Sequence, residues 1–283
     1  MQVLSLTSVF FAIIFIASCA VNAQANNLFD PKNWEGVDAL LVGEQHDAPE
    51  HQRVQRELVE SLAARQALAA VVLEMADRGA STAGLMPDAT PDAVQTALRW
   101  KVAGWDWNTY APVVMAAVRA GVPVWGGNLP RDELRSAMQN TQARDDLLRV
   151  GGNSAVQMQL DAVREGHCNL LPASQLEPML RVQVARDQAL AAAVRQQVGA
   201  RASPTQTVLL IAGSMHVDAR VGAPLHLSPG LKVKIVQLSV DAAQSATKSE
   251  ALRRSQAGFD ARWTTAAPPA KDYCAQLKAP ATK

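Results

Sequence analysis

Four short, continuously apolar segments, separated by longer stretches of helical character, most constrain how this chain can fold. They cover residues 39–42, 69–73, 122–125 and 208–212. Strands that are apolar without alternation are buried on both faces, which is typical of parallel sheets with helices on either side. The pattern therefore predicts an α/β fold with a mainly parallel sheet flanked by helices.

The remaining segments complete this outline. Residues 224–227 and 233–240 are expected to form two further strands, and residues 130–200, which hold no strand-like run, to form an inserted helical subdomain. Beyond residue 241 the pattern gives way to Ala, Gln, Thr, Pro and Lys. We therefore expect the α/β domain to occupy residues 26–240 and a C-terminal tail to occupy residues 241–283. Helices are predicted over residues 47–66, 108–120, 153–164 and 174–198.

The first residues are typical of an export signal. Residues 9–17 form an unbroken apolar run, which is too short to span a bilayer but suits the apolar part of a signal peptide. The segment that ends at Cys19 resembles the lipobox of bacterial lipoproteins, whereas Ala23-Gln24-Ala25 suits ordinary cleavage. We expect a signal peptide over residues 1–25, and either an outer-membrane lipoprotein anchored through a lipid on Cys19 or a periplasmic protein.

Export sets the redox state that the cysteines are expected to have. The chain contains Cys19, Cys168 and Cys274. If Cys19 is lipidated or removed, an even pair remains in an oxidising compartment. A Cys168–Cys274 disulfide would then tie the tail to the body, and the alternative is two free thiols.

The charge balance excludes one class of partner. Lys and Arg number 27 against 26 Asp and Glu, which gives a net charge of +1, and no segment is strongly one-signed. A nucleic-acid-binding protein normally carries a basic stripe. We therefore expect no nucleic-acid partner.

Polar residues follow four of the predicted strands. Glu44 and His46 follow the first strand, Glu74 the second, Asn128 the third and His216 the fourth. Because ligands of open α/β sheets bind beyond the carboxyl ends of the strands, we expect these side chains to share one rim. Two carboxylates and two imidazoles could hold a divalent metal, with one carboxylate as general base. They could equally form a structural hydrogen-bond cluster.

Aromatic residues gather in one short segment. Trp100, Trp105, Trp107 and Tyr110 lie close together in a chain that has only 6 Trp and 2 Tyr. Such side chains suit a planar ligand or an interface, and the alternative is a subdomain core. A tyrosine phenolate is also an oxygen ligand that haem iron accepts, which makes Tyr110 a candidate iron ligand.

A further polar stretch runs from Gly166 to Pro172 and is followed by Gln183 and Asp187. The last two residues are four apart, so they share one helical face beside an apolar stripe. We expect them to hydrogen-bond to a neighbouring element such as the rim, and a solvated patch is the alternative.

Together these motifs resemble the ChaN-type haem-binding uptake lipoproteins, which belong to a superfamily with Tiki/PrgY-type proteins and erythromycin esterases. The resemblance extends from about residue 38 to residue 238 and implies an α/β fold with a helical subdomain. Met215 replaces a small residue of the family pattern, and Gln52 follows His51 where the family often has a second His. The motifs that carry it are Leu41–Asp47, Leu73–Met75, Trp107–Pro112, Gly121–Arg131, His167–Pro172 and Gly213–Val217.

The resemblance implies an exported, iron-regulated haem-binding protein that serves haem and iron acquisition, with haem at a homodimer interface and a tyrosine as iron ligand. We assign that tyrosine to Tyr110. The alternative is a metal-dependent hydrolase that uses the Glu and His rim, and the first interpretation, in which the protein is not an enzyme, is preferred. The expected haem-binding residues are Tyr110, His46, Glu44, Glu74, Asn128 and His216, and the hydrolase would use Glu44, His46, Glu74 and His216.

Overall fold

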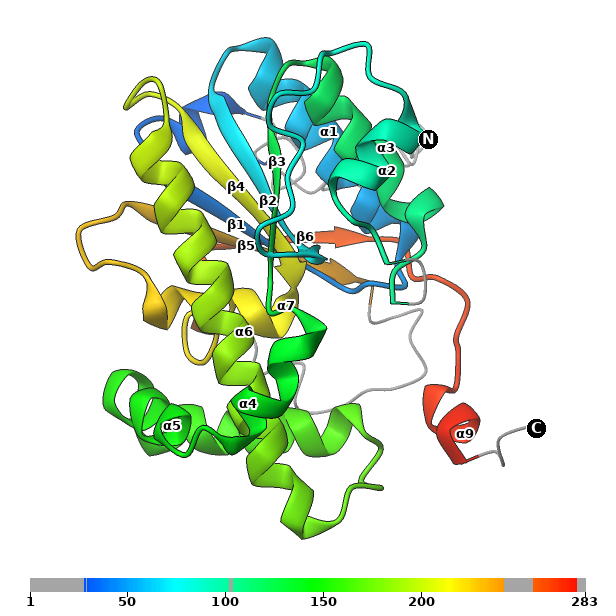
Figure 1. Cartoon of the computed structure of the whole chain (residues 1–283), viewed down its shortest axis with the longest axis vertical. Helices are drawn as coiled ribbons and strands as arrows, with labels where there is room; N and C mark the ends of the chain where they lie inside the picture. The colour runs from blue at the N-terminus through cyan, green and yellow to red at the C-terminus, as the bar shows by residue number, and fades with distance from the viewer. Residues whose placement is uncertain (1–27, 29, 102–103, 242–256, 279–283) are drawn as a thin grey trace, which may run out of the picture.

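The computed structural model describes residue 28 and residues 30–101, 104–241 and 257–278 (Figure 1). The expected signal peptide, including Cys19, lies outside the described residues. Within the described part of the chain, no helix combines the length and apolar composition needed to cross a membrane.

A six-stranded parallel sheet forms the centre of the described structure, with strand order β3-β2-β4-β1-β5-β6. Every residue of β1 and β4, the two central strands, is buried. This burial on both faces explains why these strands are continuously apolar in the sequence. The strands are β1 (Ala39–Glu44), β2 (Leu68–Asp77), β3 (Val124–Asn128), β4 (Thr207–Gly213), β5 (Val233–Val240) and β6 (Ala261–Thr265).

Helices cover both faces of the sheet (Figure 1). On one face, Leu40 of β1 packs in a core with Leu58 of α1 and Val114 of α3. On the other face, the adjacent Leu41 packs in a core with Leu190 of α6. The sheet is therefore enclosed as the sequence predicts. The helices are η1 (Pro31–Trp34), α1 (Pro49–Ala64), α2 (Pro91–Ala97), α3 (Trp107–Arg119), η2 (Arg131–Glu133), α4 (Leu134–Gln139), α5 (Gln142–Gly166), α6 (Ala173–Ala200), α7 (Ser214–Val217), η3 (Ala223–His226) and α9 (Tyr273–Lys278).

The segment 130–200 is helical, and one of its helices belongs to two layers. The second half of α6 packs on the sheet through Leu190 and Val194. Its first half packs through Leu180 in a separate core with Leu147 of α5. The helical subdomain is therefore joined to the sheet by one continuous helix, which fixes α5 relative to the carboxyl ends of the strands.

Two sequence-based expectations are corrected. Residues 224–227 are not a strand, because Pro224 lies in the first turn of the 3-10 helix η3, where its missing N–H and fixed φ are tolerated. The segment 241–283 is not only a tail, because β6 pairs in parallel with β5. As an edge strand with mostly exposed or half-buried side chains, β6 lacks the apolar run that marks a buried strand.

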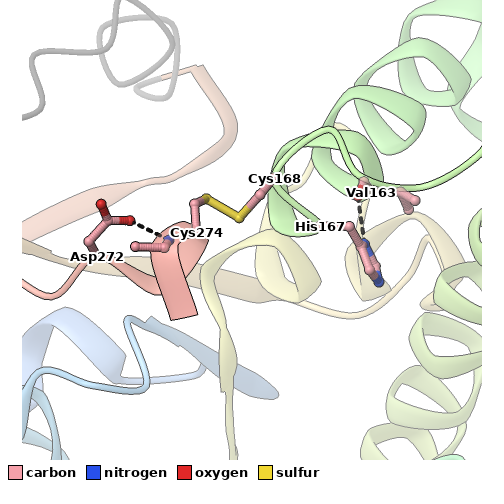
Figure 2. Close-up of a disulfide and its surroundings, with 6 residues drawn as sticks. Val163, His167, Cys168, Asp272 and Cys274 are labelled. Atoms are coloured by element: carbon pink, nitrogen blue, oxygen red, sulfur yellow. Dashed lines mark hydrogen bonds between the residues drawn. A yellow bond between two sulfur atoms is a disulfide. The ribbon is translucent and has the colours of Figure 1, made fainter. Parts of the chain in front are cut away.

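The C-terminal segment returns to the body of the protein through a disulfide (Figure 2). Cys274 in α9 is bonded to Cys168 in the turn between α5 and α6, with 5.5 Å between the two Cα atoms. The pair expected from the sequence is thus joined. We call residues 266–273, which run from the end of β6 to the first residue of α9, the C-terminal strap; in Figure 1 they run along the outside of the molecule toward the lower helices.

Candidate functional site

A cavity of about 850 Å³ lies at the carboxyl ends of the central strands. The ends of β1 and β4 form its floor, the last turn of α5 and the middle of α6 form one wall, and the C-terminal strap forms another. The lining includes Glu44, His46, Glu74, Trp105, Gln159, His167, Gln183, Arg186, Gly213, Met215, His216, Leu238, Arg262, Pro268, Lys271 and Tyr273.

Glu44, at the end of β1, is a buried carboxylate whose two oxygens are both hydrogen-bonded. Oε1 accepts a 2.5 Å hydrogen bond from Tyr110 Oη and lies 2.7 Å from His46 Nδ1. Oε2 accepts a 2.9 Å hydrogen bond from Gln52 Nε2 and another from Gln55 Nε2, both on α1. A buried carboxylate requires such partners, because leaving it unpaired away from water is very costly. Glu44 therefore positions His46 at the cavity surface.

The position of Tyr110 corrects the expectation that it ligates iron. The side chain is only 2 % exposed and is absent from the cavity lining. Burial and the neighbouring Glu44 carboxylate raise the pKa of Tyr110 far above its usual value. Because an iron-bound tyrosine is a phenolate, a buried phenol that donates to a carboxylate is unsuited to that role. Tyr110 instead supports Glu44.

The aromatic cluster divides between the core and the cavity. Trp100 and Trp107 pack against the core that α1 and α3 form with the sheet. Trp105 is half-buried, lines the cavity and packs edge-on against the His46 ring, with 4.6 Å between ring centroids. Only Trp105 of the expected cluster is therefore placed to contact a planar ligand.

A second buried chain of charges runs from β2 to α6. Glu74 Oε2 accepts a 2.7 Å hydrogen bond from the backbone N–H of Gly213, and Glu74 Oε1 lies 3.5 Å from His216 Nε2. The other ring nitrogen of His216, Nδ1, lies 2.6 Å from Asp187 Oδ1. The expectation that Asp187 reaches the rim is thus confirmed. His46 Nε2 lies 3.8 Å from Glu74 Oε2 and links this chain to Glu44.

These contacts set the protonation of the cluster. Burial lowers the pKa of His216, but Glu74 and Asp187 raise it more strongly, to about 9. Burial raises the pKa of Asp187 to about 6, against the opposing effect of His216. For Glu74, burial raises the pKa, yet His216 and His46 lower it below its usual value. For His46, burial lowers the pKa, but the Glu44 hydrogen bond together with the charges of Glu74 and Glu44 outweighs this effect, so the pKa is raised.

Asn128 is not part of this cluster, contrary to the sequence-based expectation. It ends β3, which is an outer strand of the sheet, whereas the cavity lies at β1 and β4. Its Oδ1 accepts a 2.8 Å hydrogen bond from the backbone N–H of Leu129. The asparagine therefore ends the strand locally and does not face the cavity.

Within the described ranges, no group of three or more His, Cys, Asp and Glu side chains is arranged to hold a metal ion. The imidazoles of His46 and His216 are instead paired with carboxylates. Of the two interpretations left open by the sequence, the geometry matches the hydrogen-bonded cluster.

Several cavity residues were not found by sequence reasoning. Lys271 and Tyr273 belong to the segment interpreted as a tail, and Arg186 lies next to Asp187 on α6. Tyr273 Oη donates a 2.5 Å hydrogen bond to Asp47 Oδ2, which raises the pKa of Tyr273 to about 12. Its position next to Cys274 was the available signal, because a disulfide expected to hold the tail would also hold its neighbour.

The fold and the site together define a parallel α/β protein with a ligand-sized cavity at the carboxyl edge of its sheet. The family described as haem-binding uptake, Tiki superfamily, ChaN matches residues 32–227, and the chain belongs to this family. The C-terminal strap and the disulfide partner Cys274 lie beyond the matched residues.

One solved structure has the same fold, and two further structures match more weakly. The ChaN protein of Campylobacter jejuni, described in a study of cofacial haem binding, is 23% identical with a TM-score of 0.53, and the match covers 72% of this chain and 82% of that chain. An erythromycin esterase in its open conformation is 13% identical with a TM-score of 0.38, and the match covers 75% of each chain. A Bacillus cereus protein is 13% identical with a TM-score of 0.33, covering 76% of this chain and 68% of that one. No curated protein matches the chain by sequence.

Proposed function

We propose that this protein binds haem in the cavity at the carboxyl ends of β1 and β4, and that it serves haem and iron acquisition. The observation that carries the proposal is the composition of this one cavity in a chain of the haem-binding uptake family. Its volume of about 850 Å³ lies in the range of cofactor pockets.

The chemistry of the lining fits a haem group. Haem presents a flat apolar ring, two carboxylates and an iron that takes axial ligands from His, Met, Tyr or Cys. The cavity offers apolar surface at Trp105, Leu238 and Pro268, and cationic side chains at Arg186, Arg262 and Lys271. The cavity side chains of the types that ligate haem iron are His46, His167, Met215 and Tyr273, of which His46 and Tyr273 already contact carboxylates. When bound, haem would supply the iron. The protein would supply the apolar cavity surface, the cationic side chains that pair with the haem carboxylates, and the side chain that holds the iron.

A homodimer is the second part of the proposal. Met215 lines the cavity and is still 39% exposed, so the cavity mouth carries apolar surface that reaches solvent. Cofacial haem binding is described for the Campylobacter jejuni protein. A second copy of this chain, placed mouth to mouth, would cover both the exposed methionine and the outer face of the ring.

Export is the third part of the proposal. It is supported by the apolar run at residues 9–17, with Cys19 as the site of a lipid anchor at the outer membrane and signal cleavage in the periplasm as the alternative. The disulfide supports an oxidising compartment.

The metal-dependent hydrolase is not favoured. Both oxygens of Glu44 are occupied by Tyr110 and by glutamine amides. A carboxylate held in this way is not available to activate a water molecule.

Haemin titration of the chain lacking residues 1–25 tests the proposal. We expect a saturable Soret absorbance and a haemin-dependent increase in mass by sedimentation, from monomer to dimer. A variant in which Trp105 is replaced by Ala should bind more weakly, whereas Trp107→Ala, which changes the neighbouring core, serves as the control. Absence of saturable binding by the wild type would refute the proposal.

A further inference from the structure

His167 lines the same cavity from the wall opposite the strand ends, directly after the last turn of α5. Its Nδ1 lies 2.7 Å from the backbone carbonyl oxygen of Val163, and Figure 2 shows the second ring nitrogen pointing away from that bond. A carbonyl oxygen can only accept a hydrogen bond, so Nδ1 carries the proton. In the neutral ring the lone pair is therefore on Nε2.

The turn that carries His167 is held in a fixed geometry. Cys168 and Asn169 have φ angles of 56° and 60°, a left-handed conformation that is uncommon for residues other than glycine. Their backbone N–H groups donate to the carbonyls of Glu165 and Arg164 at 2.8 and 2.9 Å, which closes the end of the helix. The disulfide fixes the turn to α9 (Figure 2). Strained backbone held by its surroundings is typical of functional sites.

The other four histidines either contact other groups through their ring nitrogens or lie outside the cavity. His46 and His216 pair with carboxylates through their ring nitrogens. His51 is fully buried, and its Nδ1 accepts a hydrogen bond from the backbone N–H of Gln45. His226 lies in η3, away from the cavity. Within the described part of the chain, His167 is thus the cavity imidazole that no carboxylate pairs with.

We propose that His167 Nε2 would hold the metal of the ligand that binds in this cavity. This inference rests on the proposed haem function and names the residue that the function requires. Neutral imidazole is the commonest metal ligand in proteins, and a backbone carbonyl on the other nitrogen fixes the ring orientation and increases ligand basicity. With the proton on Nδ1, the Nε2 lone pair would be available to a metal, and no proton would have to leave the ring.

The first test uses the protein without haem. Long-range nitrogen–proton NMR of the histidine rings reports which nitrogen carries the proton. We expect the neutral ring of His167 to be the Nδ1–H tautomer. The Nε2–H tautomer would overturn the proposal, because the lone pair would then face the Val163 carbonyl.

The second test compares variants by haemin titration, electron paramagnetic resonance and resonance Raman spectroscopy. His167→Gln should lose the iron–imidazole signature and weaken haemin binding at least tenfold. His167→Ala should regain the signature when free imidazole is added, which a merely structural role would not produce. His226→Gln, in a histidine outside the cavity, should leave the spectrum and the affinity unchanged.

The outcomes separate this inference from the proposed function. If the wild type binds no haemin, the proposed haem-binding function is refuted, and so is the proposed role of His167. If the wild type and His167→Gln give the same spectrum and affinity, the function stands and the inference is refuted. A tyrosinate signature that persists in His167→Gln and disappears in Tyr273→Phe would transfer the ligand role to the strap.

Discussion

Tyr110 and Glu44, which are 66 positions apart in the sequence, are joined by a 2.5 Å hydrogen bond beneath the cavity floor. The bond connects α3 to the end of β1. Since Glu44 also contacts His46 Nδ1, the phenol acts on the cavity indirectly, by fixing the carboxylate that orients the imidazole. A residue that attracts attention as an iron ligand in the sequence is therefore a support in the structure.

Replacing Tyr110 by Phe should lower stability and leave haemin binding largely intact. The change removes one donor from a buried carboxylate, which costs about 1–3 kcal/mol. Urea unfolding and Soret titration measure the two effects separately. Tyr273→Phe is the matched control, because the Tyr273 side chain is exposed and its loss should change stability by less than about 0.5 kcal/mol. Loss of haemin binding in Tyr110→Phe with unchanged stability would contradict this assignment.

The free energy of unfolding should fall as the pH rises from 6.5 to 9. Burial lowers the pKa of His216, but Glu74 and Asp187 raise it to about 9 in the folded protein, above the usual histidine value of 6.5. The protonated imidazole therefore stabilises the fold fully below pH 6.5, and this stabilisation, on the order of 3 kcal/mol, is lost by pH 9.

Urea unfolding at several pH values checks the slope. His216→Gln should flatten it, whereas His226→Gln should not, because burial lowers the pKa of His226 and moves its titration below this range. A wild-type stability that is constant from pH 6.5 to 9 would show that the buried chain of charges does not titrate in this way.

Removing the disulfide should loosen the C-terminal strap. In the double variant Cys168→Ser/Cys274→Ser, no cross-link closes the 106-residue separation between the two positions, and the expected loss of stability is about 2–5 kcal/mol. The strap should also become sensitive to proteases, and haemin should dissociate faster. Limited proteolysis with mass spectrometry and stopped-flow transfer of haemin to apomyoglobin measure these effects. The oxidised wild type is the control, and equal dissociation rates would show that the strap does not retain the ligand.

Arg186 should discriminate between haemin and its dimethyl ester. The side chain lines the cavity, its Nε is buried without a hydrogen-bond partner, and its charge contributes to lowering the pKa of the nearby Glu74 and Asp187. A carboxylate of the ligand would satisfy it, since guanidinium–carboxylate pairs are strong and directional. Arg186→Gln should weaken haemin binding about tenfold and leave the binding of the ester unchanged. Arg195→Gln, on the same helix but outside the cavity lining, should behave like the wild type for both ligands.

The central part of the fold could be predicted from the sequence because its physical cause is local. Residues 39–42 and 208–212 are continuously apolar since both faces of their strands are covered, and the structure confirms them within β1 and β4. The edge strand β6 has no such pattern, because most of its side chains reach solvent and, among the described residues, it pairs on one side only. The position of β6 in the sheet can be identified only from its pairing with β5 in the structure.

The candidate site, like the fold, could be predicted from the sequence only in part. Glu44, His46, Glu74 and His216 could be placed on one rim, because the carboxyl ends of parallel strands meet at one edge. Asn128 was misplaced, since the sequence does not show that its strand is an outer one. The partners of the rim come from helices, and their contacts depend on tertiary packing that no local pattern reveals.

Because the C-terminal strap forms part of the cavity, the cavity is completed only after synthesis of the strap and formation of the disulfide. One wall of the cavity comes from residues that follow the strand ends and α5 in the sequence and are therefore synthesised after them, and that wall is fastened only when Cys274 has been oxidised against Cys168. A chain that is still emerging from the ribosome, or that has not met an oxidant, has the strand ends and α5 but no fastened wall. We therefore expect the cavity to retain a ligand only after the strap has been synthesised and the disulfide has formed.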